Sequence, residues 1–361
     1  MKVLFPLDGD QNPFVEELAY GLRQHGVEVV VSSRRFWERK EFDFDIVHFQ
    51  WAESLFHWKI PTYPEILYFQ RRIEELRNQC SIFYTRHNRQ THVSDPIFQV
   101  AIREIERLLL ENVHAVHHLG WKSYKETLPW FPKERYKHFV IPHHTYDSMY
   151  KDLRSKSQKV ARRKVGLPLH KKVILAFGAF RCEGERTLVR NAIRDCKNRK
   201  AIVFAPLWKT PRFHGFQFRK PRRLILSVIR SANCYRDRIR IRNWKGLSPE
   251  WVASCFNASD VILLQRQRAL NSGNLPMGFQ FGKVVVGTND GVIGEILGET
   301  GNPYFSPEVR ASVAKAVEAG LRLCSEGKGR DNLEHAEKEW SLRKVSGEIL
   351  KAYELARFRR E

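Results

Sequence analysis

Four consecutive residues, Asn271, Ser272, Gly273 and Asn274, have the types and the position of a phosphate-binding turn. They follow the apolar segment 261–264, which predicts a strand, and precede the apolar segment 275–281, which predicts a buried helix. The first turn of a helix presents unbonded N–H groups and the positive end of the helix dipole. We therefore predict that this turn binds a phosphate. Glycine that only permits a tight turn is the alternative interpretation.

A carboxylate follows at the distance where Rossmann-like sites bind a ribose. A second apolar strand at 284–287 leads into Gly291 and Gly294, and Glu295 comes directly after them. In dinucleotide-binding folds, an acidic residue about twenty positions beyond the phosphate turn binds the ribose. Glu295 is therefore the predicted ribose ligand.

These segments belong to a longer alternation of strands and helices. Asn12 and Pro13 are typical of the first residues of a helix, and Gly26 is typical of its end. Strands are predicted at 3–7, 27–31, 45–49, 82–85 and 114–118, with further helices at 64–79 and 96–111. Continuous apolar strands that alternate with helices indicate a parallel, doubly wound sheet.

The alternation stops once and then starts again. Residues 151–164 are polar and basic and are interpreted as a connector. Further strands are predicted at 172–178, 201–204, 238–241, 261–264 and 284–287. A chain of 361 residues exceeds what one core usually covers. The predicted fold class is α/β, with two Rossmann-like domains facing a central cleft. The predicted domains are 1–150 and 151–333, and a C-terminal helix at 334–361 is expected to pack back on the first domain.

The composition limits the choice of partner and compartment. The chain has 62 Lys and Arg against 40 Asp and Glu, a net charge of +22, which favours phosphates, nucleic acid or anionic lipid. It has no apolar run long enough to span a membrane, and its N-terminus is interpreted as a strand and not as a signal peptide. The 6 cysteines are scattered, which indicates reduced thiols in the cytoplasm and no metal binding by cysteine.

Several segments, taken in order, resemble a known group of enzymes. They are Asp45-Ile46-Val47-His48-Phe49-Gln50-Trp51, Tyr84-Thr85-Arg86-His87-Asn88 with His92, His117-His118-Leu119-Gly120, Val140-Ile141-Pro142-His143, Phe177-Gly178-Ala179-Phe180-Arg181, and the stretch from Asn271 to Glu295. Over nearly its full length the chain resembles the two-domain GT-B glycosyltransferases. Within them it is similar to the family-4-like enzymes that build bacterial capsule, exopolysaccharide or O-antigen.

The resemblance implies that the second domain holds a nucleotide-sugar donor and the first holds the acceptor. In such enzymes the donor diphosphate lies on a helix N-terminus and is matched by an Arg and often a Lys. Arg181 stands at the position of that Arg, and its alternative interpretation is a surface side chain in a loop. The companion Lys is absent, so Arg186 or Lys209 would supply the second cation.

Two departures from the family pattern affect the expected contacts with the donor sugar. The family pattern has two glutamates where this chain has Ala269 and Met277, and neither side chain accepts a hydrogen bond as a carboxylate does. The resemblance implies a retaining hexosyltransferase, but these departures leave the stereochemistry open. Fixed cations and helix N–H groups would stabilise the leaving group, so neither a metal nor another cofactor is expected.

Candidate catalytic residues lie in the first domain. His87 ends a predicted strand, and the resemblance implies that a histidine there touches the donor sugar or the acceptor hydroxyl, which it would orient or deprotonate. Capping a helix or bonding to the backbone is the alternative. Asp8 and Asp10, in the first strand-to-helix turn, are the candidate bases if the enzyme inverts. Weaker candidates are His118, His143 and Trp51, of which Trp51 would stack on a sugar or simply pack.

The basic residues suggest a surface partner. Lys and Arg are concentrated at 212–242, and around 121–139 they alternate with aromatic residues, as at a membrane interface. The expected location is cytoplasmic, peripheral at the inner face of the plasma membrane, with a lipid-linked or glycan acceptor. A solvated cationic face is the alternative.

Two other functions compete with glycosyl transfer. A catalytically silent sugar- or nucleotide-binding protein is suggested by Ala269 and Met277. A nucleic-acid-binding protein is suggested only by the charge, because the chain has no recognisable nucleic-acid module. The base, the sugar, the acceptor and the linkage have no signature in the sequence.

Overall fold

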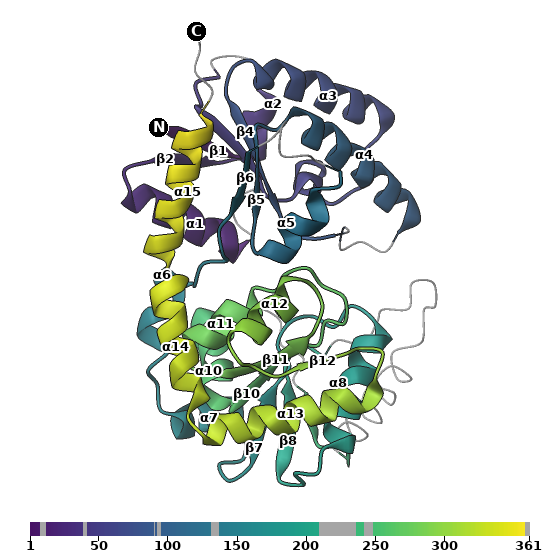
Figure 1. Cartoon of the computed structure of the whole chain (residues 1–361), viewed down its shortest axis with the longest axis vertical. Coiled ribbons are helices and arrows are strands. Elements are labelled where there is room, and N and C mark those ends of the chain that lie inside the picture. Colours follow the sequence, from purple (N-terminus) through teal and green to yellow (C-terminus); the bar gives the residue numbers. More distant parts are fainter. Residues whose placement is uncertain are drawn as a thin grey trace, which may run out of the picture. The chain divides into compact units, whose positions relative to one another are not determined.

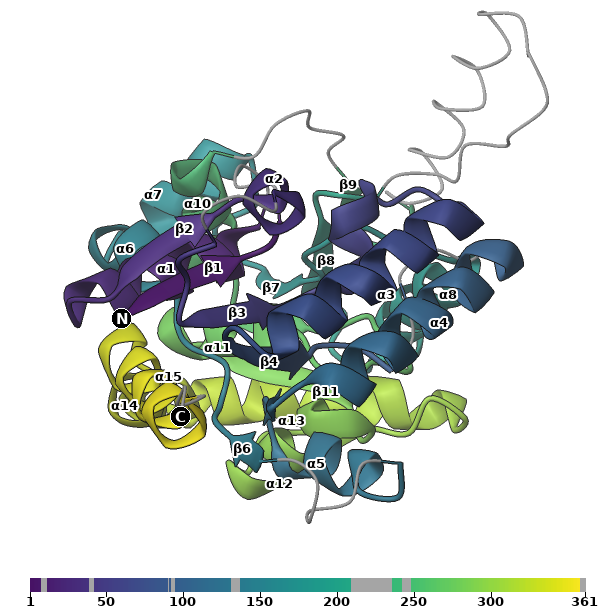
Figure 2. The same cartoon turned by 90° about the horizontal axis from the view of Figure 1, so that it is seen from above.

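The structure is a computed structural model that describes residues 1–7, 12–38, 42–89, 91, 95–130, 137–208, 236–241 and 248–357. The chain divides into two compact units, Met1–Ser148 with Glu339–Glu361, and Met149–Lys338. Each is a parallel sheet with helices (Figures 1 and 2). The predicted α/β class with two Rossmann-like halves is confirmed. In the described part, no helix is long and apolar enough to cross a membrane.

The first unit is built on a parallel sheet of six strands in the order β2-β1-β3-β4-β5-β6. The strands are β1 (Lys2–Phe5), β2 (Glu28–Val31), β3 (Ile46–Phe49), β4 (Ser81–Arg86), β5 (Ala115–His118) and β6 (Lys137–Val140). The helices are α1 (Pro13–Gln24), α2 (Ser33–Trp37), the 3-10 helix η1 (Ala52–Phe56), α3 (Tyr63–Arg77), α4 (Pro96–Asn112), α5 (Trp121–Thr127) and α15 (Leu342–Ala356), with α6 (Asp147–Tyr150) at the boundary. Helices α1 and α15 pack on one face of this sheet, and α3 and α4 pack on the other.

Helix α1 begins and ends where the sequence predicts. The Asn12 side chain accepts a hydrogen bond from the Phe14 N–H at 3.0 Å, and Gly26 follows the helix with a φ of +78°. Helix α15 lies against α1, and Gly21 allows the close approach (Figure 1). A β-carbon at Gly21 would lie 2.9 Å from the β-carbon of Ser346. The C-terminal helix is therefore part of the first unit.

The second unit has a parallel sheet in the order β12-β11-β10-β7-β8-β9. The strands are β7 (Lys172–Leu175), β8 (Ala201–Ala205), β9 (Ile239–Ile241), β10 (Val261–Leu263), β11 (Val284–Thr288) and β12 (Tyr304–Phe305). The helices are η2 (Lys151–Leu153), α7 (Gln158–Val165), α8 (Glu183–Asp195), α10 (Pro249–Ala258), α11 (Asn274–Gln280), α12 (Gly291–Glu299), α13 (Arg310–Ser325) and α14 (Lys328–Glu339). The interpretation of 151–164 as a mere connector is wrong, because α7 packs against α10.

The strand order locates the place where each unit is expected to bind a ligand. In open α/β sheets, ligands bind beyond the carboxyl ends of the strands, where the strand order reverses direction. That point lies between β1 and β3 in the first unit and between β7 and β10 in the second. The loops after these four strands therefore position the candidate sites.

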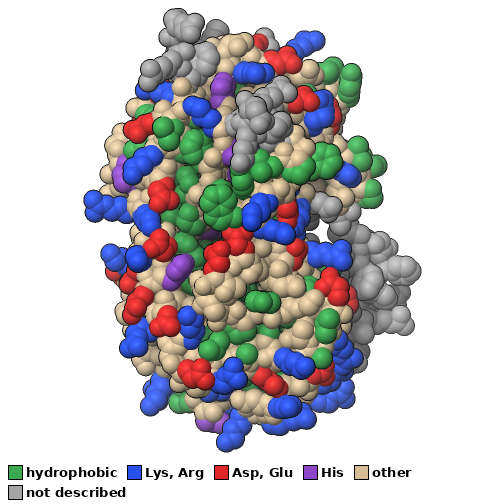
Figure 3. All heavy atoms as spheres, viewed as in Figure 1, with side chains coloured by type: hydrophobic (Ala, Val, Ile, Leu, Met, Phe, Trp, Pro, Cys, Tyr) green, Lys and Arg blue, Asp and Glu red, His purple; other side chains and the backbone are tan. Residues whose placement is uncertain are grey.

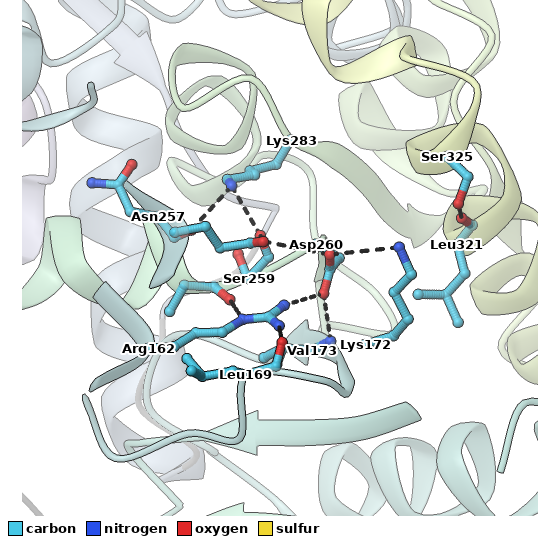
Figure 4. Close-up of polar contacts among 12 residues, drawn as sticks. Arg162, Leu169, Lys172, Val173, Asn257, Ser259, Asp260, Lys283, Leu321 and Ser325 are labelled. Atoms are coloured by element: carbon cyan, nitrogen blue, oxygen red, sulfur yellow. Dashed lines mark hydrogen bonds and ion pairs between the residues drawn. The ribbon is translucent and has the colours of Figure 1, made fainter. Parts of the chain in front are cut away.

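A buried polar cluster joins the elements at the opposite end of the second sheet (Figure 4). The Asp260 carboxylate accepts hydrogen bonds from the Arg162 guanidinium at 2.6 Å and the Val173 N–H at 2.7 Å. Lys283 Nζ donates to the carbonyls of Ser259, at 2.9 Å, and Asn257, at 3.3 Å. Both cations thus lie at the negative, carboxyl-terminal end of α10. The cluster ties α7, α10, β7 and β11 together.

A chain of hydrogen bonds crosses the core of the first unit. His117 Nε2 lies 2.9 Å from the Ile141 carbonyl, which only accepts, so His117 carries its proton there. Thr85 must then donate to His117 Nδ1 at 3.0 Å and accept from His48 Nε2 at 2.7 Å. His48 Nδ1 in turn accepts from the Tyr353 hydroxyl of α15 at 2.6 Å. Each ring nitrogen of His48 and His117 has a hydrogen-bond partner when both histidines are neutral.

We expect Asp260→Asn to lower the free energy of unfolding by about 3 kcal/mol, because it leaves the buried Arg162 charge without a counter-ion. Lys172→Met is the matched control. Its ammonium lies 3.9 Å from Asp260 and its side chain is 41% exposed, so a loss under about 1 kcal/mol is expected. Urea unfolding followed by circular dichroism measures both. Equal destabilisation by the two variants would contradict the structural role of Asp260.

Acidification is expected to begin to destabilise the first unit near pH 6.5, above the range where carboxylates titrate. Burial lowers the pKa of His117 and His144 to about 4, and that of His143 to about 3, with the His144 charge lowering the last further. An unfolded chain protonates its histidines near pH 6.5, so it binds more protons below that pH. Stability is therefore full above pH 6.5 and lost as the pH falls towards 4, by up to about 1.4 kcal/mol per pH unit for each histidine. Urea midpoints that stay constant from pH 7 to 5.5 would contradict this.

Candidate functional site

The loop after β7 is held by side chains from the loop after β10. Asn274 Nδ2 donates to the Phe177 carbonyl at 2.8 Å, Gln265 Nε2 to the Gly178 carbonyl at 3.4 Å, and Arg266 to the Ala179 carbonyl at 2.8 Å. Gly178 has a φ of +105°, which favours glycine. The structure therefore brings the loop that carries Arg181 against the predicted phosphate turn.

The predicted phosphate turn precedes a short helix. Helix α11 has 7 residues, so its dipole is short, and the Asn274 side chain is engaged with the backbone of the neighbouring loop. Asn271, Ser272 and Gly273 are half-buried. Fixed cations are therefore better suited than this helix end to bind an anion in this part of the unit.

One carboxylate at this edge of the sheet contacts the backbone of Arg181 and the side chain of Arg266. Glu185, buried on α8, accepts a hydrogen bond from the Arg181 backbone N–H at 2.7 Å and one from the Arg266 guanidinium. Partial burial, and then the charge of Arg266, lowers the pKa of Arg181 to about 10, so it stays protonated at neutral pH. The Glu185 charge acts in the opposite direction on the Arg181 guanidinium, and Arg181 is exposed at the surface. Such a group is suited to a phosphate or diphosphate.

Of the two further cations predicted at this site, the structure describes Arg186. Arg186 is buried and donates to the carbonyls of Cys182, at 2.9 Å, and Phe180, at 3.3 Å, so it supports the loop from within. Lys209 lies outside the described residues. Arg266 is the cation that sequence reasoning missed. The sequence feature that could have identified it is its position shortly after β10, the strand beside β7 at the point where the strand order reverses.

The turn after β11 lies beside the loop after β10. The backbone of Val292 donates to the Leu270 carbonyl at 2.8 Å, and a β-carbon at Gly291 would lie 2.5 Å from the Ala269 carbonyl. Glu295 is half-buried on α12. Burial of Glu299, one turn further along α12, raises its pKa, and the charge of Glu295 raises it further. Ala269 is half-buried and Met277 is buried. They stand at the two positions where the resembling glycosyltransferases have glutamates.

In the first unit, His87 is enclosed by three side chains. The imidazole follows β4, and its Nε2 lies 2.8 Å from Oε1 of Gln50, which follows β3. The Trp51 ring stacks on the imidazole with centroids 4.0 Å apart and planes 17° apart. The Phe14 ring meets the imidazole edge-on at 4.8 Å. The side chains that follow two adjacent strands thus hold His87 in one orientation.

The remaining acceptor-side candidates are more dispersed. His118 bonds to His138 at 3.0 Å and to Ser123 at 3.1 Å, and burial, with the neighbouring positive charges, lowers its pKa to about 2. His143 meets Phe14 edge-on at 4.8 Å, so it shares that ring with His87. Asp8, Asp10 and His92 lie outside the described residues. Among those described, His87 and His143 are the candidates that the structure brings near each other.

No protein-family model matches the chain, and no curated protein sequence matches it. Solved structures match it over nearly its whole length. Sucrose-phosphate synthase from Thermosynechococcus elongatus is 15% identical, with 98% of each chain covered and a TM-score of 0.71.

Anabaena HepE in complex with UDP-glucose is 14% identical, covering 98% of this chain and 100% of its own, with a TM-score of 0.67. A glycosyltransferase from Rickettsia africae is 12% identical, with 98% of each chain covered and a TM-score of 0.67. At such identities a likeness shows the fold. The chain therefore has the two-domain GT-B fold of these structures.

Proposed function

We propose that this protein transfers a sugar from a nucleoside-diphosphate donor to an acceptor hydroxyl. The observation that carries the proposal is the pair Arg181 and Arg266, held by Glu185 where the strand order of the second unit reverses. The similar HepE structure contains UDP-glucose. The GT-B fold, the place of the arginines and their charge all agree with a diphosphate donor.

Each unit has a part in this mechanism. The two arginines bind the diphosphate and stabilise the charge that develops as it leaves, which is often the largest catalytic contribution. Glu295 binds the ribose, and His87 orients the acceptor hydroxyl. Because the arginines supply fixed positive charge, the transfer needs no metal or other cofactor. If the anomeric configuration is inverted, Asp8 or Asp10 is the proposed base. Retention remains the proposal that follows from the sequence resemblance.

The proposed acceptor is a lipid-linked or glycan intermediate of bacterial surface polysaccharide synthesis. On the face shown in Figure 3, Lys and Arg are spread over both units and mixed with acidic side chains. Helix α5 and the turn after it expose Trp121 and Trp130, 54% and 77% exposed, together with Lys122 and Lys125. Aromatic and basic groups suit an anionic lipid surface. We propose that this α5 surface attaches the protein to the cytoplasmic face of the membrane.

One other function remains open. Ala269 and Met277 remove the carboxylates that would hold a donor sugar, which favours a catalytically silent protein that only binds nucleotides or sugars. Turnover of nucleotide sugars across a broad acceptor panel separates the two functions. Tight diphosphate binding without turnover would favour the silent protein. Nucleic-acid binding has no support beyond the net charge.

We expect Arg181→Ala and Arg266→Ala each to weaken diphosphate binding about tenfold or more, because each removes a charge-assisted hydrogen bond worth about 1.5–3 kcal/mol. A thermal-shift screen of nucleoside diphosphates first identifies the ligand, and calorimetry then measures its affinity. Arg190→Ala is the control, since it removes an equal charge from α8, where Arg190 pairs with Glu183. If Arg181→Ala binds as tightly as the control, the donor site is not at this pair.

Membrane attachment is tested by sedimentation with vesicles at low salt. The double variant Lys122→Gln, Lys125→Gln should reduce binding to anionic vesicles roughly thirtyfold, since each basic residue near such a surface contributes about 1 kcal/mol. Arg322→Gln with Arg330→Gln removes the same charge from exposed positions of the second unit and should have less effect. Equal binding to neutral and anionic vesicles would count against the proposal.

A further inference from the structure

His143 lies against the start of α1, the helix that follows β1 at the point where the strand order of the first unit reverses. The segment that carries it follows β6, and Nε2 of its neighbour His144 lies 3.0 Å from the Phe14 carbonyl of α1. The Phe14 ring meets the rings of both His143 and His87 edge-on at 4.8 Å. The two imidazole centroids are therefore at most about twice that distance apart.

The backbone determines where His143 carries its proton. Its Nδ1 lies 2.7 Å from the His144 carbonyl, which only accepts, so Nδ1 is the donor. Burial, and then the charge of His144, lowers the pKa of His143 to about 3, so the ring is neutral at pH 7. In a neutral imidazole whose proton lies on Nδ1, the lone pair lies on Nε2. Ring contacts with Phe14 and Tyr146 hold this nitrogen in one direction.

The Nε2 of His143 makes no hydrogen bond within the described part of the chain. The residue is half-buried, so this nitrogen is not sealed in the core. Other histidines of the first unit use both ring nitrogens inside the protein, namely His48, His117, His118 and His144. Those rings link groups of the core. His143 instead keeps an accepting nitrogen that a ligand can reach.

The chemistry of this nitrogen selects the kind of ligand. An imidazole with a pKa of about 3 is a poor general base, because efficient bases titrate near the working pH. It still accepts a hydrogen bond from a neutral hydroxyl, and the carboxyl edge near a reversal of strand order is where open α/β sheets bind ligands. A metal ion fits less well, since among the described residues no group of three or more His, Cys, Asp or Glu could hold one.

We propose that His143 binds the sugar acceptor, with its Nε2 accepting a hydrogen bond from one of the sugar hydroxyls. The ligand class is a neutral polyhydroxylated acceptor. This inference rests on the proposed function, because it names a second acceptor contact of the same enzyme besides His87. His143 orients a hydroxyl, and another group removes the proton.

Chemical modification tests whether the nitrogen is accessible and whether a sugar covers it. Diethyl pyrocarbonate transfers an ethoxycarbonyl group to an imidazole nitrogen with an accessible lone pair, and tandem mass spectrometry locates the modified residue. In the full-length wild type at pH 7 we expect modification of His143 and none of His144, which is the control. The methyl glycosides of glucose, galactose and mannose, tried in turn at high concentration, should include one that slows the reaction at His143. If His143 resists as His144 does, or if none of the three slows its modification, the proposal is overturned.

Steady-state kinetics with an acceptor that supports turnover test the contact itself. His143→Asn keeps an amide that can donate to the His144 carbonyl, but it has no atom at the position of Nε2. It should raise the acceptor KM about fivefold, the loss expected for one neutral hydrogen bond, and leave the donor KM unchanged. His143→Gln, whose longer side chain brings an amide oxygen to that position, should recover most of the affinity. An unchanged acceptor KM in His143→Asn would contradict the contact.

His25→Asn is the matched control for these kinetics. The His25 imidazole also bonds to a backbone carbonyl, that of Arg343 at 3.0 Å, but it lies at the carboxyl-terminal end of α1. Its replacement should leave both KM values unchanged. Circular dichroism checks that each variant is folded.

The modification experiment uses neither donor nor turnover, so the two proposals fail separately. If the wild type neither binds a nucleoside diphosphate nor transfers a sugar, but a methyl glycoside protects His143, sugar transfer is overturned and sugar binding at His143 is supported. If transfer occurs and His143→Asn leaves the acceptor KM unchanged, the proposed function stands and the role of His143 is overturned.

Discussion

Burial of a parallel sheet on both faces is the constraint on which both units depend. The strands β3, β8 and β11 are buried at every position, so side chains along them pack or, like His48, bond to other groups of the core. Polar groups that face a ligand are then expected in the loops at the strand ends, and the carboxyl ends of parallel strands share one edge. The reversal of strand order leaves room at one point of that edge. Arg181 and Arg266 lie at that point in one unit, and Gln50 and Trp51 lie there in the other.

The second unit places two cationic clusters at opposite ends of its sheet, and they differ in how their donors are used. Around Asp260, the donors of Arg162 and Lys283 are directed at backbone carbonyls and the carboxylate, in the interior of the fold. Around Glu185, one carboxylate anchors two arginines, and Arg181 reaches the surface. The first arrangement stabilises the fold. The second places Arg181 at the surface of the unit.

Histidine has a structural use in the first unit that differs from its use as an acid or base. Neutral imidazole donates at one nitrogen and accepts at the other, so it can link polar groups across a core without burying a charge. His48 and His117 do this between α15 and β6. Burial that keeps these rings neutral also makes the unit sensitive to acid.

The sequence by itself determined the alternation of strands and helices, the Asn12 cap and the loop that carries Arg181, because these depend on periodicity and on residues close in the chain. It also indicated that no carboxylate stands at Ala269 or Met277. The tertiary structure decided which side chains meet. Arg266 pairs with Glu185 across 81 residues, and His48 with Tyr353 across 305. Sequence reasoning left the second donor cation open between Arg186 and Lys209, did not identify Arg266, and interpreted residues 151–164 as a connector. Strand order sets these contacts, and hydrophobic periodicity carries no record of strand order.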